Sequence, residues 1–249
     1  MDAMNMRTAV IVDAVRTPVG KRNGALAKTH PADLGAHIIS ALIERTGVDP
    51  NVVDDVVFGC LDTIGGQAGN VARTAWLAAG LPLAIPGTTV DRQCGSSQQA
   101  AHFAAQGIIA GAYDVVIAAG VESMSRVPMG FTTAGRSPYG PSIEARYPDG
   151  LVGQGISAEL VAAKWKFDRD ALDSFAAESH RRAAQAATDG FFDREILPID
   201  VADAETALGS PRLPGELAKL RTRQRLPEQS RYRLPQLRHR NSSIPVPVK

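Results

Sequence analysis

Short apolar runs alternate with helix-like stretches over the first 120 residues, and this alternation limits the possible folds more than any other feature. The runs are rich in β-branched residues and cover positions 8–13, 55–60, 87–90 and 113–120. Helical patterns lie between them, at positions 31–46, 71–79 and 97–110. Such alternation indicates a parallel sheet with helices on both faces. The sequence therefore predicts an α/β protein with a βαβαβαβ layer, in which residues 8–13 form a buried strand and residues 113–120 a central one.

Cys94 lies where the third apolar run gives way to the helix that follows it. Residues 87–90 are strand-like, and residues 97–110 are rich in Ala, Gln and Ile and therefore helix-like. The free amides and the positive end of a helix favour a thiolate at such a place. Gly95 permits a tight turn and the close approach of a substrate. Cys94 is therefore a candidate nucleophile, although these residues alone leave a buried structural cysteine equally open.

The two cysteines, Cys60 and Cys94, are too few to indicate a disulfide framework. Cys60 ends the second apolar run, so we expect it to be buried and inert. No apolar run approaches the length of a membrane span, and the N-terminus has no signal-peptide pattern. The 249 residues suffice for one large domain or two small ones. The sequence predicts a reduced, cytoplasmic protein.

Positive charge is concentrated at the end of the chain. Residues 206–249 carry ten Lys or Arg and two Asp or Glu, while the whole chain has a net charge of +1. Arg, Pro, Gln and Ser dominate this stretch without apolar periodicity, which predicts a disordered, aberrant tail of the kind that a shift of reading frame would produce. The alternative is a basic arm for nucleic acid or an anionic surface, but the arginines form no face and Tyr232 is the only aromatic residue there.

Residues 91–99, with the sequence Asp-Arg-Gln-Cys-Gly-Ser-Ser-Gln-Gln, resemble the nucleophile segment of the thiolases, the acyl-CoA:acetyl-CoA C-acyltransferases. Three other segments resemble thiolase motifs in the family's order: Arg-Thr-Pro-x-Gly at 16–20, a glycine-rich segment at 65–73, and Gly-x-Glu-Ser-Met-Ser at 120–125. The family places the glycine-rich segment at its dimer interface. The resemblance runs over residues 7–201 and is greatest to the actinobacterial thiolases of steroid side-chain and fatty-acid β-oxidation.

The resemblance also predicts the domain organisation. Residues 1–121 would form the thiolase N-terminal core, and residues 122–205 the α-rich loop domain that covers the active site and holds coenzyme A. Helices are expected in that loop domain at residues 153–165 and 169–187. A thiolase has two similar halves, and the Asn-Glu-Ala-Phe, Gly-His-Pro and Cys-x-Gly-Gly-Gly segments of the second half do not occur here. The expected fold is therefore a truncated thiolase-like fold that lacks the C-terminal half.

The resemblance implies acyl transfer through a cysteine thioester. In the family the nucleophile, which Cys94 matches, attacks the carbonyl of a 3-ketoacyl-CoA, releases acetyl-CoA and passes the acyl group to a second CoA. The reverse reaction is a Claisen condensation. The Cys94 amide at the helix start would supply one oxyanion contact. Acyl-CoA esters are the expected substrates and the chain would form a homodimer or tetramer, without a permanently bound cofactor, a metal, a nucleic acid or a membrane.

The base and the acid of the family reaction have no match in this sequence. The base belongs to the missing Gly-His-Pro segment, and Cys60 does not match the second catalytic cysteine. His102 follows Cys94 by eight residues, roughly 12 Å along a helix, and cannot pair with it. The other histidines carry no catalytic motif and are mostly expected at the surface: His30, His37, His180 and His239. We therefore expect the chain to be inactive, or nearly so, by itself.

Two other functions remain open on the sequence. A β-ketoacyl-carrier-protein synthase has the same fold and a cysteine at a helix start, but it lacks a loop domain like residues 126–199 and the segment at 91–96. A non-catalytic fragment that dimerises is the third possibility. Half of a pseudo-symmetric core would expose a large apolar face, and such faces promote association.

Overall fold

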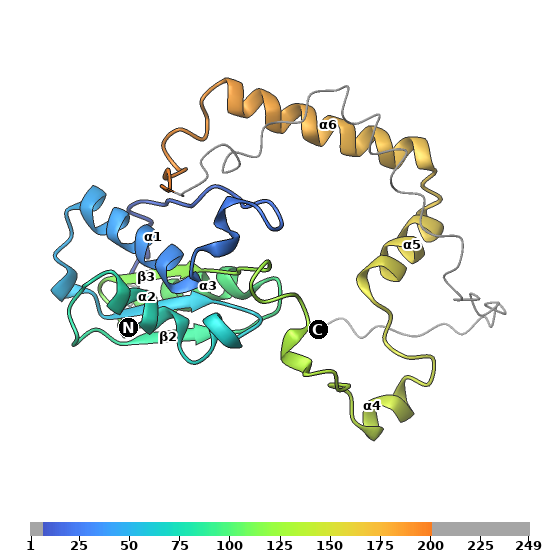
Figure 1. Cartoon of the computed structure of the whole chain (residues 1–249), viewed down its shortest axis with the longest axis horizontal. Helices are drawn as coiled ribbons and strands as arrows, with labels where there is room; N and C mark the ends of the chain where they lie inside the picture. Colours follow the sequence, from blue (N-terminus) through green and yellow to red (C-terminus); the bar gives the residue numbers. More distant parts are fainter. Residues whose placement is uncertain (1–6, 201–249) are drawn as a thin grey trace, which may run out of the picture. The chain divides into compact units, whose positions relative to one another are not determined.

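The computed structural model describes residues 7–200, and its centre is a three-stranded parallel sheet (Figure 1). The strands are β1 (Asp55–Gly59), β2 (Gly87–Val90) and β3 (Val116–Gly120), in the order β2-β1-β3. In the ladders Val56 pairs with Gly87 and with Ile117, and Gly59 pairs with Val90 and with Gly120. The carboxyl ends of all three strands therefore meet at one edge, and the predicted α/β class is confirmed.

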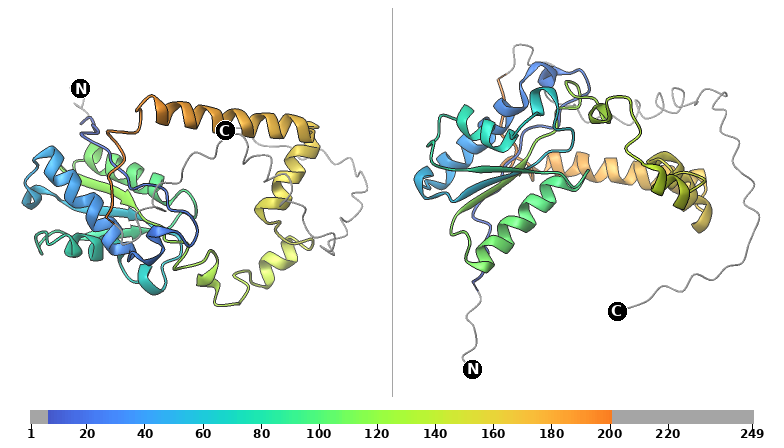
Figure 2. Two further views of the ribbon diagram at one scale, coloured as in Figure 1. Left: turned by 45° about the horizontal axis from the view of Figure 1, so that its top comes forward. Right: turned by 90° about the horizontal axis from the view of Figure 1, so that it is seen from below.

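Helices cover both faces of this sheet (Figure 2). The helices α1 (Pro31–Thr46) and α2 (Val71–Ala78) pack together on one face, and α3 (Ser96–Ala110) covers the other. The bounds of α1 follow from its ends: Pro31 occupies the first turn, the His30 side chain accepts a hydrogen bond from the Ala32 amide, and Gly47 ends the helix at φ +66°. The helices predicted at 31–46, 71–79 and 97–110 thus form with almost the predicted bounds.

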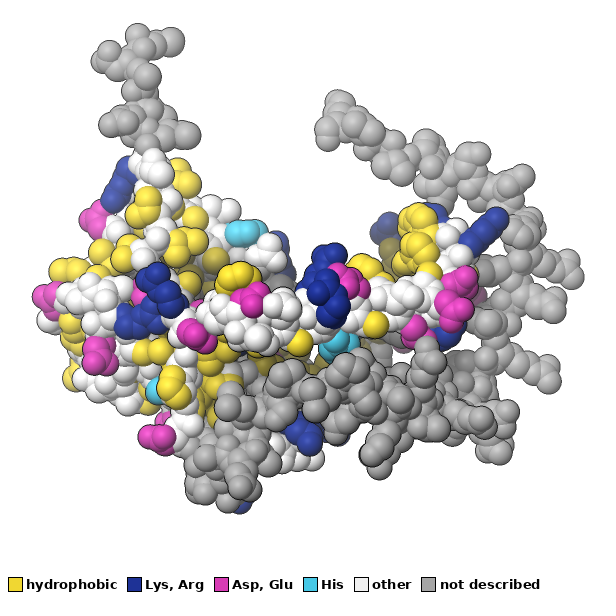
Figure 3. Space-filling view, turned by 90° about the horizontal axis from the view of Figure 1, so that it is seen from above, with side chains coloured by type: hydrophobic (Ala, Val, Ile, Leu, Met, Phe, Trp, Pro, Cys, Tyr) yellow, Lys and Arg dark blue, Asp and Glu magenta, His cyan; other side chains and the backbone are white. Residues whose placement is uncertain are grey.

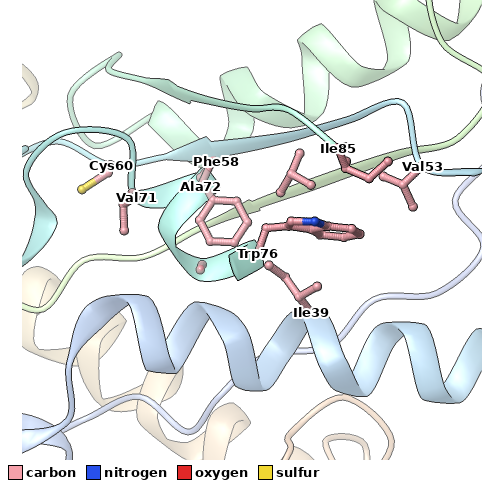
Figure 4. Close-up of a cluster of buried hydrophobic side chains, with 10 residues drawn as sticks. Ile39, Val53, Phe58, Cys60, Val71, Ala72, Trp76 and Ile85 are labelled. Carbon is pink, nitrogen blue, oxygen red and sulfur yellow. The ribbon is translucent and has the colours of Figure 1, made fainter. Parts of the chain in front are cut away.

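The hydrophobic core lies between the sheet and the α1–α2 layer (Figure 4). Trp76 of α2 is fully buried between Phe58 of β1 and Ile39 of α1, and its indole N–H donates to the Pro82 carbonyl at 2.8 Å. The remaining members of this cluster are Val53, Val56, Cys60, Val71, Ala72, Ala75 and Ile85. β1 is buried at every position, as expected for the central strand of a sheet that is covered on both faces.

The prediction of a first, buried strand at residues 8–13 is wrong. Val10, Ile11 and Val12 expose 71%, 89% and 76% of their surface, and no strand forms there. Asp13 instead pairs with Arg45 of α1 at 2.8 Å. The prediction that residues 113–120 form a central strand is also wrong, because β3 is an edge strand within the described residues. Both errors have the same cause. Within residues 7–200 no strand lies along the outer edge of β3, so β3 is not central and residues 8–13 have no strand to pair with.

The chain after β3 is helical and largely exposed. It contains α4 (Pro141–Arg146), α5 (Gln154–Trp165) and α6 (Arg169–Thr188), of which the last two match predicted helices. One short 3-10 turn, η4 (Phe131–Thr133), also lies in this part of the chain. Three others precede β3: η1 (Ala25–Lys28), η2 (Pro50–Val52) and η3 (Gly65–Gln67). Phe175 is 80% exposed and Phe191 is 72% exposed. Figure 3 shows hydrophobic side chains interspersed with charged ones on the molecular surface. The domain limits at 121 and 205 stay predictions, and the tail at 206–249 lies outside the described residues.

Candidate active site

Cys94 lies in the turn between β2 and α3, as the sequence predicts, and its side chain is exposed. The preceding Gln93 has φ +49°, in the left-handed region that residues other than glycine seldom adopt. Local hydrogen bonds hold this conformation: the Asp91 carboxylate accepts from the Gln93 amide at 2.7 Å, and the Ser96 hydroxyl donates to the Gln93 carbonyl at 2.5 Å. The strained turn therefore presents Cys94 just before the first turn of α3.

The start of α3 rests directly on two glycines at the carboxyl ends of the strands. Gly59 of β1 and Gly120 of β3 are partners in the ladder. A Cβ atom on Gly59 would overlap the Ser96 carbonyl carbon and the Ser97 amide, and one on Gly120 would overlap the Ser97 side chain. Only glycine allows this approach, so these two positions fix where α3, and hence Cys94, can lie.

A polar network, buried at Gln67 and Ser123, joins the loops that follow β1 and β3. The Glu122 carboxylate accepts from the Leu61 amide at 2.7 Å and from the Gln67 side chain at 2.7 Å. Gln67 is fully buried; its side chain also donates to the Asp62 carbonyl at 2.8 Å and accepts from the Ser123 amide at 2.6 Å. The sequence analysis missed this network, although Gln67 and Glu122 both lie in segments that it singled out.

Asp62 extends this network to the chain that leaves β3. Its side chain accepts a hydrogen bond from the Thr132 hydroxyl at 2.8 Å and from the Gly130 amide at 3.3 Å, and the residue is only 2% exposed. The start of the predicted loop domain is thus bonded to the loop that follows β1. In the sequence, Asp62 could be recognised only as an acidic residue shortly after a predicted strand. Acidic residues are common in loops, and the spacing of Asp62 from the other motifs is not distinctive.

Asn70 belongs to the glycine-rich segment that the resemblance places at a dimer interface, and it has a role within the chain. Its side chain accepts from the Arg73 amide at 3.2 Å, which caps α2. It also donates to the Gly87 carbonyl at 2.6 Å and accepts from the Thr89 hydroxyl at 3.0 Å. Asn70 therefore ties α2 to β2, the strand that leads to Cys94.

The two cysteines lie in opposite environments. Cys60 is 1% exposed, and burial, followed by the charges of Glu122, Asp62 and Asp91, raises the pKa of its thiol to about 12. At pH 8 a thiol with that pKa is ionised in about one molecule in ten thousand. The prediction that Cys60 is buried is confirmed, and its high pKa explains why it would be inert.

Alkylation should separate these environments. When the native protein is treated with iodoacetamide at pH 8, we expect Cys94 to react on the order of a hundredfold faster than Cys60. Cys94 is accessible to the reagent, whereas Cys60 is buried and its raised pKa leaves little of the reactive thiolate. Mass spectrometry of tryptic peptides at successive times gives both rates. Denaturation in urea is the control, in which the rates should converge. Equal rates in the native protein would contradict the described burial.

Among residues 7–200, no described hydrogen bond joins a histidine side chain to Cys94. His30 caps α1, and His37 lies on the same helix with a buried Nε2 atom that has no hydrogen-bond partner among the described residues. His102 on α3 and His180 on α6 are exposed. Surface placement is thus confirmed for these last two, while His30 and His37 are partly buried; His239 lies outside the described residues.

Within positions 7–200, no group of His, Cys, Asp and Glu is arranged to hold a metal ion. None of the helices between these positions is long and apolar enough to cross a membrane.

Comparison with known proteins identifies the family. The family model described as "Thiolase, N-terminal domain" matches residues 9–212. This chain belongs to the thiolase family. The match covers the strand-to-helix turn that carries Cys94 and separates the chain from the β-ketoacyl-synthase alternative.

The similar proteins include a thiolase of steroid breakdown, the kind to which the sequence motifs show resemblance. The chain is 48% identical over 203 residues to the steroid 3-ketoacyl-CoA thiolase FadA6 of Mycobacterium tuberculosis. This match covers 78% of this chain and 50% of that protein. It is 40% identical over 205 residues to a 3-ketoacyl-CoA thiolase of Aliivibrio fischeri, covering 82% of this chain and 52% of the relative.

A solved structure supports the same assignment. The crystal structure of the Bacillus anthracis acetyl-CoA acetyltransferase matches with a TM-score of 0.68 and 35% sequence identity, over 80% of this chain and 52% of that one. The predicted thiolase-like fold is therefore confirmed. This thiolase chain spans about half the length of the relatives it matches.

Proposed function

We propose that this chain carries the nucleophile half of a 3-ketoacyl-CoA thiolase, and that Cys94 is the residue that accepts the acyl group. The observation that carries the proposal is the exposed Cys94 thiol in a strained turn at the start of α3, at the carboxyl ends of the strands. Parallel α/β sheets bind their ligands at that edge. The substrates would be 3-ketoacyl-CoA esters of lipid or steroid breakdown in the cytoplasm, and the chain would act as a homodimer or tetramer.

The chemistry is a nucleophilic acyl transfer in two stages. The Cys94 thiolate attacks the 3-keto carbonyl, the bond between C2 and C3 breaks, and a proton on C2 completes acetyl-CoA while the acyl group stays on Sγ as a thioester. The thiolate of a second CoA then attacks this thioester, which releases acyl-CoA and restores Cys94. The backbone amides at the start of α3 would stabilise negative charge on the attacked oxygen.

The first stage needs a proton donor for C2, and the second needs a base for the incoming CoA thiol. Within residues 7–200 no described hydrogen bond joins a histidine to Cys94. Cys60 is 1% exposed, which keeps its thiol from a substrate as a proton donor, and its pKa of about 12 excludes it as the base. Residues that act as a unit lose most of the rate together. The proposal is therefore that the chain alone can be acylated but does not turn over.

Acetylation without turnover tests this proposal. Incubation with acetyl-CoA should transfer an acetyl group from CoA sulfur to Cys94, with free CoA as the leaving group, and mass spectrometry should find the thioester on Cys94 and not on Cys60. Incubation with acetoacetyl-CoA and CoA should form acetyl-CoA no faster than a Cys94→Ser variant does. Modification absent from Cys94 would refute its role, and thiolysis above the variant's rate would refute the missing base.

A further inference from the structure

A tight turn joins β2 to α3, and Cys94 is part of it. The Gly95 amide donates to the Arg92 carbonyl at 3.0 Å, and the Ser96 amide donates to the Gln93 carbonyl at 3.1 Å. Gln93, the residue before Cys94, has φ +49°. A residue such as glutamine seldom adopts this conformation, because its Cβ atom comes too close to the following carbonyl oxygen. The turn therefore keeps its shape only if other contacts stabilise it.

Two side chains hold both polar backbone groups of Gln93. The Asp91 carboxylate accepts a hydrogen bond from the Gln93 amide at 2.7 Å, and the Ser96 hydroxyl donates to the Gln93 carbonyl at 2.5 Å. The same hydroxyl accepts from the Arg92 amide at 2.9 Å. A hydroxyl can donate and accept at once, so the single oxygen of Ser96 binds two successive residues of the turn. We call Asp91 and Ser96 the Gln93 clamp.

The two members of the clamp are attached to different elements of the fold. Asp91 directly follows β2, whose last residue, Val90, pairs with Gly59 of β1. Ser96 is the first residue of α3 and is only 5% exposed, so the loss of its hydroxyl would leave backbone groups unpaired where little water can reach them. Cys94 lies between these two anchor points. The clamp therefore fixes the direction in which Cys94 leaves the turn.

The hydrogen bonds of the turn leave the amide of the nucleophile unused. The amides of residues 92, 93, 95 and 96 all donate in the bonds given above. Among residues 7–200, no acceptor is described for the Cys94 amide. This amide belongs to the same residue as the thiol, so it can donate to the oxygen of an acyl group that approaches Sγ. The clamp thus sets the positions of the thiol and of this amide together.

We propose that Asp91 and Ser96 are positioning residues for the Cys94 nucleophile, which hold Gln93 in its left-handed conformation and so direct the thiol at the acyl carbonyl. This inference rests on the proposed function of Cys94. Acyl transfer from a bound ester needs the attacking atom in one orientation, whereas a small alkylating reagent reaches an exposed thiol from many directions. Loss of the clamp should therefore slow acyl transfer much more than alkylation.

Hydrogen exchange tests whether the clamp exists, independently of any reaction at Cys94. We expect the Gln93 amide of an Asp91→Ala variant and the Arg92 amide of a Ser96→Ala variant to exchange at least about tenfold faster than in the wild type. Nuclear magnetic resonance of the 15N-labelled full chain gives these rates. Asp91→Asn keeps an acceptor oxygen and should keep the protection of the Gln93 amide. Unchanged exchange in both alanine variants would overturn the proposal.

Two rates at the same thiol test the positioning role. With acetyl-CoA, we expect both alanine variants to form the Cys94 thioester at least about tenfold more slowly than the wild type. Their alkylation by iodoacetamide should stay within about twofold of the wild-type rate. Asp91→Asn should regain most of the acetylation rate. Unchanged acetylation would overturn the proposal, and so would an equal slowing of both reactions, because that result indicates a general disturbance of the fold.

Ser97→Ala is the matched control for the loss of the Ser96 hydroxyl. Ser97 is the next residue of α3, and its exposed side chain makes no hydrogen bond within the described part of the chain. This variant should be acetylated and alkylated at wild-type rates. A loss as large as that of Ser96→Ala would contradict a specific role for the clamp.

Glycine at position 93 tests the route by which the clamp acts. Glycine adopts the left-handed conformation without a steric penalty, so adding Gln93→Gly to Asp91→Ala should raise the acetylation rate at least about threefold. A double variant as slow as Asp91→Ala would overturn the proposed route. If wild-type Cys94 is alkylated but not acetylated, the proposed function fails instead, and the exchange rates still decide whether the clamp exists.

Discussion

Replacing Gly59 by Ala is expected to lower the free energy of unfolding by about 3 kcal/mol, at the upper end of the range for overpacking. The added Cβ would overlap the Ser96 carbonyl carbon and the Ser97 amide, which are backbone atoms at the start of α3 and cannot turn aside as a flexible side chain would. The helix must move away from β1 or the strand must bend. Urea unfolding followed by circular dichroism measures the loss, and the alkylation rate of Cys94 should change as well.

Gly155→Ala is the control for this substitution. Gly155 lies in α5, and a Cβ atom there would meet nothing within 4 Å. Ala is the better helix former, so we expect this variant to be unchanged or more stable by about 0.5–1 kcal/mol. If Gly59→Ala proved as stable as the wild type, the close contact between α3 and β1 would be disproved.

Trp76→Ala should cost about 3–5 kcal/mol of stability, the usual range when a large buried aromatic side chain is removed. Trp76 is fully buried between α1 and β1, and its loss would leave a cavity beside Phe58 and Ile39 and free the Pro82 carbonyl from its hydrogen bond. Tryptophan fluorescence is altered by the change itself, so far-ultraviolet circular dichroism in urea is the suitable measurement.

The neighbouring Leu77 supplies the comparison. It lies one position further along α2, but 41% of its surface is exposed and it is not part of the buried cluster. We expect Leu77→Ala to cost less than about 1 kcal/mol, because little apolar surface is lost from the core. Similar losses for the two variants would mean that α2 does not pack as described.

Local signals in the sequence determined most of the elements. The helix at Pro31–Thr46 was predictable because a proline begins it and a glycine in the left-handed conformation ends it. The position of Cys94 between β2 and α3 was predictable because β-branched residues change there to helix formers. Each signal acts within a few residues along the chain and needs no tertiary information.

The errors and omissions all concern distant parts of the chain. Residues 8–13 have a strand-like composition, but a strand also needs a partner, and composition does not reveal whether one is present. Gln67 and Glu122 are separated by 55 positions, and only the folded sheet brings them into contact. The role of Gly59 and Gly120 likewise depends on their pairing across β1 and β3, which their sequence positions do not show.

The contrast between Cys60 and Cys94 also determines how this chain would respond to oxidants. An exposed cysteine that is oxidised to a sulfenic acid is normally rescued when a neighbouring thiolate condenses with it to a disulfide. Cys60 is the only other cysteine in the sequence, and its pKa of about 12 keeps it protonated. Within these 249 residues Cys94 therefore has no second thiolate that could resolve its sulfenic acid. Its sulfenic acid must be reduced by an external thiol such as glutathione, or it proceeds to the irreversible sulfinic acid.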